Sequence, residues 1–208
     1  MCSCDLKSCY DRIVHNAASI ALQRIGVPLG KIKVMFGAVQ KLVHHVRTMF
    51  GTSKESYGGD NDHSYPLPPQ GMGQGHGSGP TIWSILSSTI FEILHAEGFA
   101  SDFIFSISKG LFHLCGFSYV DDCNLLYIGE DIEIVAERLT SMIAMWDDLM
   151  EVNGGALAPD KCWWYLVDFH WRNGKWYMVN GGEGHELTVR DKDKNICPIP
   201  NLSPTQAK

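Results

Sequence analysis

Two adjacent aspartates, Asp121 and Asp122, form a pair of the kind that binds metal ions in enzymes. They lie in the stretch GFSYVDDCNLLYIG, where apolar residues on both sides predict two β-strands joined at the acids. A tight hairpin normally turns on Asn-Gly or Asp-Gly, because these residues accept a positive φ angle. Two neighbouring carboxylates repel each other and resist burial unless a cation compensates them. The pair is therefore better explained by a bound metal ion than by the needs of a turn.

Magnesium is the ion that this arrangement favours. Mg²⁺ takes oxygen ligands and commonly binds through one or two carboxylates together with the phosphates of a substrate. Phosphoryl-transfer sites often hold two such ions about 3.5–4 Å apart, and such a site needs a further carboxylate from another strand. Asp5 and Asp11, in the basic N-terminal part of the chain, are the candidates for that ligand.

The elements that must position these acids alternate between helices and strands. Apolar residues at helical spacing predict helices over residues 11–26, 30–43, 81–98 and 131–155. Strands are expected in the short segment that ends at Asp5, in a hairpin over 44–58, at 103–107, at 111–128 and in a hairpin around Asn173-Gly174. This order predicts an α+β fold, with an antiparallel sheet and helices packed on one face, and a split βαβ arrangement is a candidate.

Composition and charge bound the class of protein. The chain has 208 residues, of which 45% are hydrophobic, enough for a core. We find no run of about 18 apolar residues and no signal peptide, so we expect no membrane partner and an intracellular location, in the cytoplasm or nucleus. The net charge of −6 argues against a generic polyanion binder. Residues 1–50, however, carry seven Lys/Arg and two Asp.

The seven cysteines are scattered through expected strands and helices, which is typical of reduced intracellular thiols. A zinc site from Cys2, Cys4, Cys9 and His15 is the weaker alternative. The C-x-C-x4-C spacing lacks the paired knuckles of structural zinc sites.

Four motifs, in the right order between residues 5 and 162, resemble the palm domain of reverse transcriptases. YVDD, at Tyr119–Asp122, resembles its aspartate-pair motif, and DLKSCYDRI, at Asp5–Ile13, is similar to its first motif. PQGMGQGHGSGP, at Pro69–Pro80, resembles the Gln-Gly motif that opens the long palm helix, and GGALAPDKC, at Gly154–Cys162, resembles the fourth motif. An aspartate after the first-motif aromatic and a long glycine loop resemble enzymes of retrotransposons or other mobile elements. Asp11 is expected to cap or brace the following helix.

The resemblance implies an RNA-directed DNA polymerase that transfers dNMP from a dNTP to a DNA primer on an RNA or DNA template. It implies two Mg²⁺ ions, with Mn²⁺ as an alternative. Asp5 and Asp121 would bridge the ions, Asp122 would sit beside them, and the backbone carbonyl of Leu6 would also be a ligand. Lys161 matches the lysine that protonates the leaving pyrophosphate.

The resemblance also implies a nucleotide pocket. Tyr10 falls on the steric-gate position, where a ring under the sugar excludes a 2′-hydroxyl. Gln74 and Gly75 would contact the incoming nucleotide and the template base. A second pair, Gln70-Gly71, makes the register uncertain, and the usual Ser-Pro before the helix is here Gly-Pro. We favour Gln74 because it sets Pro80 six residues later, as in the family.

By the same resemblance, residues 1–180 are the palm, with partial fingers at about 28–70. Residues 181–208 are a tail that leads toward a thumb. Its last part, residues 191–208, is polar and expected to be loose. The fingers and thumb segments of a larger polymerase are expected outside this sequence. Two alternatives stay open. One is a catalytically inactive palm-fold remnant or interaction module. The other is a nucleotide cyclase with a palm-like core, which needs neither the Gln-Gly loop nor a steric gate.

Overall fold

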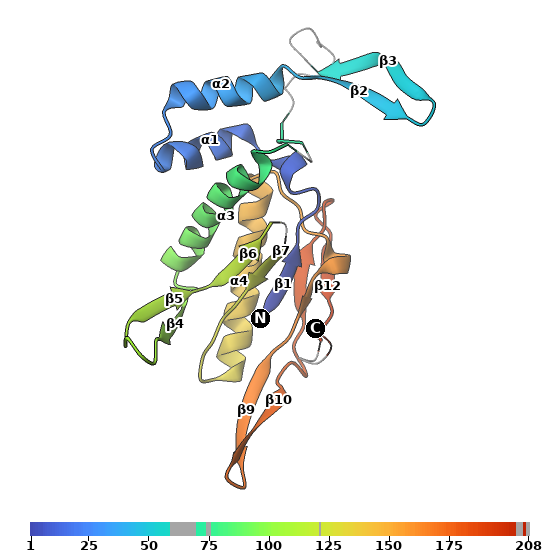
Figure 1. Ribbon diagram of the computed structural model, residues 1–208. Coiled ribbons are helices and arrows are strands. Elements are labelled where there is room, and N and C mark those ends of the chain that lie inside the picture. The colour runs from blue at the N-terminus through green and yellow to red at the C-terminus, as the bar shows by residue number, and fades with distance from the viewer. Residues whose placement is uncertain (59–69, 74–75, 121, 203–205, 207–208) are drawn as a thin grey trace. The chain divides into compact units, whose positions relative to one another are not determined.

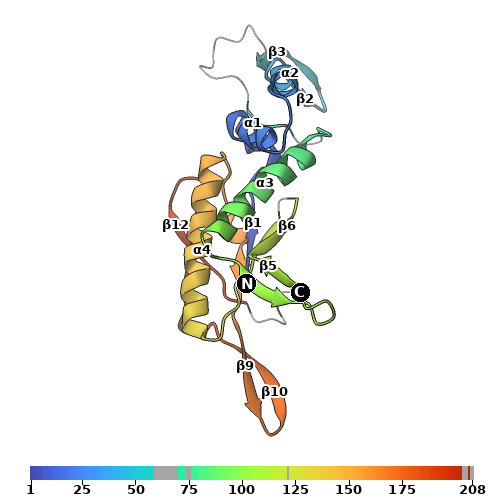
Figure 2. The same cartoon turned by 90° about the vertical axis from the view of Figure 1, so that its left-hand side faces the viewer.

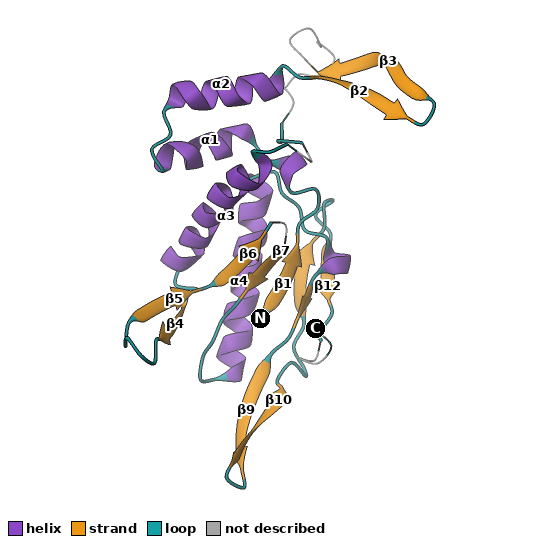
Figure 3. Cartoon of the chain, in the orientation of Figure 1, coloured by secondary structure: helices purple, strands orange, loops and turns teal. Residues whose placement is uncertain are grey.

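The structure, a computed structural model, describes residues 1–58, 70–73, 76–120, 122–202 and 206 (Figure 1). The chain divides into two compact units, unit 1 with Met1–Cys9 and Ser87–Lys208, and unit 2 with Tyr10–Leu86. The fold is α+β, with α-helices and several small antiparallel sheets (Figure 3). Among the described residues, no helix has the length and apolar character needed to cross a membrane.

Unit 1 is built on a four-stranded antiparallel sheet. Its strand order is β6 (Gly116–Tyr119), β7 (Asp122–Leu125), β1 (Cys2–Asp5) and β8 (Trp163–Trp164). Strand β1 comes first in the sequence but lies inside the sheet, paired with β7 on one side and β8 on the other. The short segment that ends at Asp5 is thus a strand, as expected.

Helix α4 (Ile132–Val152) packs against this sheet through β7, and Figures 1 and 2 show it running along one face. The predicted apolar stripe is confirmed, because Leu139, Met142, Trp146 and Met150 are fully buried. Trp146 meets Phe91 of helix α3 (Gly79–Ala96) with ring centroids 5.2 Å apart. The boundary between the two units falls within α3, after Leu86.

Three further hairpins complete unit 1. They are β4 (Ser101–Ile104) with β5 (Leu111–Leu114), β9 (Val167–Arg172) with β10 (Lys175–Asn180), and β11 (Leu187–Arg190) with β12 (Ile196–Ile199). The strand expected at 103–107 ends at Ile104. A turn follows, in which the Phe105 amide donates to the Gly110 carbonyl at 3.0 Å and Lys109 has a φ of 56°.

The expectation that residues 191–208 are loose is wrong for residues 196–199, which form β12 and pair with β11. Leu187 and Val189 alternate with exposed or half-buried neighbours and bury their side chains. Arg190 binds α4, since its Nε donates to Asp147 Oδ2 at 2.7 Å and its amide donates to the same oxygen at 3.1 Å. The segment is polar in overall composition, but its buried apolar residues and the ion pair of Arg190 hold it against α4.

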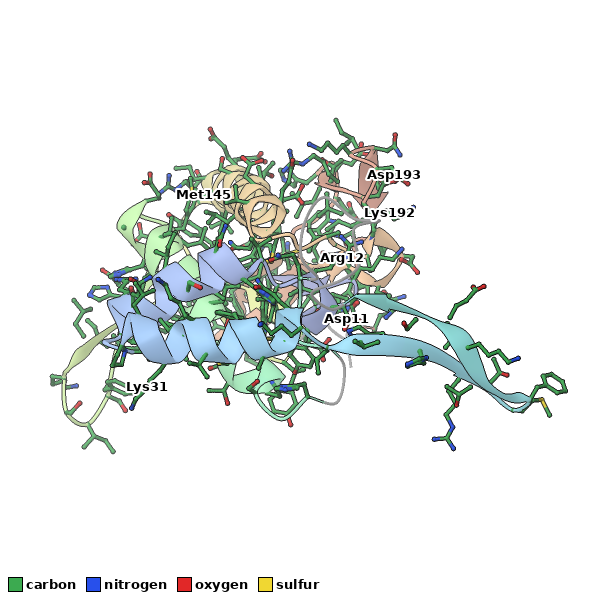
Figure 4. The ribbon with its side chains drawn as sticks, turned by 90° about the horizontal axis from the view of Figure 1, so that it is seen from above. Asp11, Arg12, Lys31, Met145, Lys192 and Asp193 are labelled. Carbon is green, nitrogen blue, oxygen red and sulfur yellow. The ribbon has the colours of Figure 1, made fainter. Side chains whose placement is uncertain are left out.

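The described residues of unit 2 form a 3₁₀ turn, η1 (Tyr10–Arg12), two helices, the first turns of α3 and a hairpin. The helices are α1 (His15–Arg24) and α2 (Leu29–Gln40), and the hairpin pairs β2 (Val43–Thr48) with β3 (Gly51–Gly58). Seen from above in Figure 4, with Asp11, Arg12 and Lys31 labelled, the hairpin extends away from α2.

Helix α1 starts later than predicted, and this changes the role of Asp11. The N-cap is Val14, whose backbone is extended and whose side chain makes no cap hydrogen bond. Asp11 lies three residues earlier, in η1, so it does not cap the helix. Its backbone instead packs against Gly71, where the glycine has no side chain to keep the two segments apart.

Candidate active site

Asp5 and Asp122 are directly opposite each other in the sheet of unit 1. The antiparallel register of β1 and β7 pairs Asp5 with Asp122 and Cys4 with Cys123. Opposite residues share a face, with Cβ atoms about 4.5–5.5 Å apart. The Asp5 side chain is 17% exposed, and Asp122 is exposed. Two carboxylates from distant parts of the sequence are therefore neighbours on an open face.

The turn before Asp122 is strained. Tyr119 pairs with Asp122 across the β6–β7 hairpin, and Val120, which follows Tyr119, has a φ of 60°. A β-branched residue in this left-handed region is an outlier that costs on the order of 1–3 kcal/mol. Such strain persists where the surroundings require it, and it often marks functional sites. Asp121 lies outside the described residues.

Lys161 brings a positive charge to this site. It ends the 3₁₀ turn η2 (Pro159–Lys161), and its Nζ lies 3.4 Å from Asp5 Oδ1. The Ala158 amide donates to the Asp5 carbonyl at 3.0 Å, which holds the preceding segment against β1. The first and fourth motifs are thus adjacent in space.

Leu6 is held by the same segment. It forms a bridge with Leu157, and the Lys7 amide donates to the Ala156 carbonyl at 2.8 Å. The side chain of Leu6 is buried. Neither this bond nor the one between Ala158 and Asp5 uses the Leu6 carbonyl, the group assigned above to a metal ion.

The donor set fits a hard divalent cation. Asp5 and Asp122 offer carboxylate oxygens, the ligands that Mg²⁺ and Mn²⁺ accept. Two carboxylates at this separation repel each other, and Lys161 supplies a single compensating charge from a side chain that is 63% exposed. A cation between the acids would remove the remaining repulsion.

A layer of buried thiols lies on the other face of the sheet. Each charged residue of the site is next in sequence to a buried cysteine: Cys4 precedes Asp5, Cys123 follows Asp122, and Cys162 follows Lys161. Since successive strand residues point to opposite faces, the thiols of Cys4 and Cys123 point away from the acids. A hydrogen bond with Cys162, another with Cys2, and burial raise the pKa of Cys4 well above its usual value. Burial likewise raises the pKa of Cys123.

These thiols should be inert in the native protein. Cys2, Cys4, Cys115, Cys123 and Cys162 are buried, whereas Cys9 and Cys197 are half-buried. Burial slows alkylation of all five, and because the thiolate is the reactive form, the raised pKa values of Cys4, Cys115 and Cys123 slow it further. A hydrogen bond with Cys4 lowers the pKa of Cys162, so the protection of Cys162 rests on its burial. We expect iodoacetamide to label two cysteines rapidly at neutral pH and the other five only after unfolding, as read by peptide mass spectrometry. Rapid native labelling of Cys4 or Cys123 would contradict the packing described here.

The residues assigned to the nucleotide pocket lie in or beside unit 2. Tyr10 packs over the start of α3, since a Cβ built on Gly79 would lie 3.4 Å from the Tyr10 Cγ atom. Gln74 and Gly75 lie outside the described residues. Tyr10 belongs to unit 2, whereas Asp5, Asp122 and Lys161 belong to unit 1.

The second Gln-Gly pair, Gln70-Gly71, has a structural role. The Gln70 Oε1 atom accepts from the His15 amide at 2.9 Å, and the Gly71 amide donates to the Ile13 carbonyl at 2.9 Å. Next to them, the Met72 amide donates to the Tyr10 carbonyl at 2.8 Å. These bonds tie the loop to η1 and α1.

His15 is a residue whose role the sequence did not reveal. Its Nε2 is 2.7 Å from the Gly71 carbonyl, its Nδ1 is 3.0 Å from Gln40 Nε2, and its ring stacks on Phe36. Burial lowers its pKa, which keeps the ring neutral. Both ring nitrogens are hydrogen-bonded within the protein, which removes His15 from the zinc alternative. A histidine on the apolar face of α1, beside Ala18 and Leu22, was the signal available.

The comparisons with known proteins leave the family open. A search of protein-family models finds none that matches the chain. The curated proteins likewise contain no match to its sequence.

Proposed function

We propose that this chain is the palm of an RNA-directed DNA polymerase, of the mobile-element type, that transfers dNMP to a primer 3′-hydroxyl on a nucleic-acid template. The observation that carries the proposal is the pairing of Asp5 with Asp122 on one sheet face, with Lys161 beside Asp5. These residues come from three of the four motifs that resemble the palm. If the motifs matched only by chance, there would be no reason for Asp5, Asp122 and Lys161 to lie together in the structure.

The assigned residues divide the work of nucleotidyl transfer. Asp5, Asp121 and Asp122 would hold two Mg²⁺ ions, together with the Leu6 carbonyl. When bound, these ions supply positive charge to the attacking and leaving oxygens of an in-line displacement. The primer 3′-oxygen gives its proton to solvent water and forms the new bond to the α-phosphorus. The bond from the α-phosphorus to the oxygen that bridges to the β-phosphate breaks, and pyrophosphate leaves. Lys161 donates a proton to the leaving pyrophosphate.

The remaining assigned residues select the nucleotide. Tyr10 is fixed against Gly79 and the Met72 amide, so its ring is placed independently of a substrate. A fixed ring under the sugar discriminates against the 2′-hydroxyl more sharply than a mobile one, because rearrangement costs energy. Gln74 and Gly75 would contact the incoming nucleotide and the template base. They precede α3 in the sequence, and a helix N-terminus favours phosphate.

Primer extension tests the proposal. The substrate is a labelled DNA primer on an RNA template, with dNTPs and Mg²⁺, and the proteins are this chain and the longest product of its reading frame. We expect Mg²⁺-dependent extension that EDTA abolishes and that dNTPs support better than NTPs. Absence of extension, together with no specific dNTP-Mg²⁺ binding by calorimetry, would instead support the inactive remnant.

A further inference from the structure

Hairpin β9–β10 is an exposed two-stranded element whose aromatic residues are not buried by the rest of unit 1. Both Figure 1 and Figure 2 show it extending beyond the other elements of that unit. Within the part of the chain that the structure describes, β9 and β10 pair with each other and with no third strand. An isolated hairpin of this kind is marginally stable in water. A binding partner would explain why this hairpin keeps large apolar side chains exposed to solvent.

The register of the hairpin separates two faces. Trp171 is opposite Trp176, and Phe169 is opposite Met178, so these four side chains share one face. Their exposed fractions are 58%, 65%, 58% and 54% for Trp171, Trp176, Phe169 and Met178. The two indole rings meet edge to face, with centroids 5.2 Å apart and planes at 66°. This face, called here the aromatic face, offers flat ring surface to a ligand.

The tip of the hairpin carries the charge. Arg172 and Lys175 are paired directly beyond the tryptophans, and both are exposed. Because successive strand residues alternate, Arg172 and Lys175 point to the face opposite the indole rings. Among the described residues the hairpin has two unpaired outer edges, and neighbouring positions are about 3.3 Å apart, so these long side chains can extend around an edge to a group beside the rings. Asp168, the one carboxylate of the hairpin, accepts from His170 Nε2 and from the Phe169 amide, each at 2.7 Å. The tip therefore presents two cations without a competing acid.

This basic tip contrasts with the sequence around it. Residues 87–208 carry nine Lys/Arg and eighteen Asp/Glu, a net charge of −9. A polyanion is repelled by most of that segment and attracted at the hairpin tip. Rings beside cations form the combination that binds single-stranded nucleic acid, where each base stacks on a ring and the phosphates contact Lys or Arg. A duplex does not fit as well, because its bases are already stacked and paired.

We propose that hairpin β9–β10 is a binding site for single-stranded nucleic acid, with bases on Trp171 and Trp176 and phosphates at Arg172 and Lys175. The site goes beyond the proposed function, since no step of nucleotidyl transfer uses these residues. Nucleic acid as the partner agrees with a polymerase, but the hairpin can bind a strand whether or not the chain is catalytic.

Fluorescence anisotropy of a labelled oligonucleotide tests this site. The probes are oligothymidylate and oligouridylate of about 12 nucleotides, and EDTA in the buffer removes any contribution of bound metal. We expect the double variant Trp171→Ala/Trp176→Ala to bind about 10-fold more weakly, because each stacked base contributes substantially to affinity. The double variant Arg172→Gln/Lys175→Gln should bind more weakly and reduce the slope of log Kobs against log salt by about 0.7 per lost phosphate contact.

Two matched controls locate the effect. Ile107→Ala removes an apolar side chain that is 97% exposed, and Lys192→Gln removes a cation from the turn between β11 and β12, where Figure 4 labels it. Both should bind the probes like the wild type. Arg172→Gln/Lys175→Gln changes only exposed side chains, so the hairpin should stay folded in this variant even if Trp171→Ala/Trp176→Ala unfolds it. Far-ultraviolet circular dichroism measures whether either variant has lost β-structure.

Several outcomes would overturn this assignment. One is an affinity within about twofold of the wild type for both double variants. Another is a self-associating wild type, seen by sedimentation equilibrium, that becomes monomeric in the tryptophan variant with unchanged oligonucleotide binding. That result would assign the aromatic face to a second copy of the chain. Because the assay needs no dNTP and no metal, an inactive polymerase leaves its result standing.

Discussion

Replacing Asp5 with asparagine should abolish nucleotidyl transfer while leaving the fold intact. Asparagine keeps the size of the side chain but removes the charge that would hold a metal ion opposite Asp122. Loss of one preorganised group that stabilises transition-state charge typically costs about 10²–10³-fold in rate. The expected result is a fall in kcat of at least this size in primer extension, with a smaller change in the KM for dNTP.

Asp5→Asn should leave the free energy of unfolding unchanged or raise it slightly. Asp5→Asn removes the repulsion between two facing carboxylates, and it also removes an ion pair with Lys161, whose side chain is 63% exposed. An exposed pair of this kind contributes about 0–1 kcal/mol, so the melting temperature should be retained. Asp193→Asn, at the turn between β11 and β12, is the matched control and should extend primers normally. An Asp5→Asn protein that extends primers at the wild-type rate would refute the assigned mechanism.

Replacing Gly71 with alanine should strongly destabilise unit 2. A Cβ at this position would lie 2.6 Å from the carbonyl carbon of Asp11 and closer still to its oxygen, and the residue has a φ of +83°. The left-handed conformation costs alanine about 1–2 kcal/mol, and the clash with backbone adds about 1–3 kcal/mol. We expect the free energy of unfolding to fall by about 2–5 kcal/mol, measured by urea denaturation.

Gly73 provides the control for this substitution. Its φ is +68°, but a Cβ there would meet nothing within 4 Å. Gly73→Ala should therefore show the conformational cost alone, about 1–2 kcal/mol. Hydrogen exchange of the Gly71 and Met72 amides should accelerate in Gly71→Ala, since both bonds to η1 and its neighbour depend on close approach. Equal destabilisation by the two variants would mean that the loop is not packed against Asp11 as described.

The sequence predicted the helices and strands of unit 1 better than it predicted the contacts between them. Helix α4 followed from an unbroken apolar stripe, and the β9–β10 turn followed from Asn173-Gly174, since both signals are local. The β11–β12 hairpin was missed because its strands are four residues each and are stabilised by Arg190 binding to Asp147 of α4. Such a contact between distant segments leaves no periodicity in either one.

The candidate site was predicted in part for the same reason. The sequence shows Asp121 and Asp122 between two apolar strands and Asp5 at the end of another, where carboxylates are unusual. The order of the motifs then suggests that these acids belong to one site. The buried thiols behind them were visible as residues but not as a layer, because only the register of β1 and β7 reveals that Cys4 faces Cys123. His15 was missed because its partner Gly71 is 56 residues away.

The central place of β1 has a consequence for synthesis of the protein. Ribosomes make the strand that carries Asp5 before its partner strand, since Asp122 is added 117 residues later. At about 5–20 residues per second, the delay is about 6–23 s. Unit 2, whose contacts join residues 10–86, can form in that interval. Cys2–Asp5 meanwhile remains an unpaired strand, available to a chaperone or to another nascent chain, and the two acids can meet only once β7 has been made.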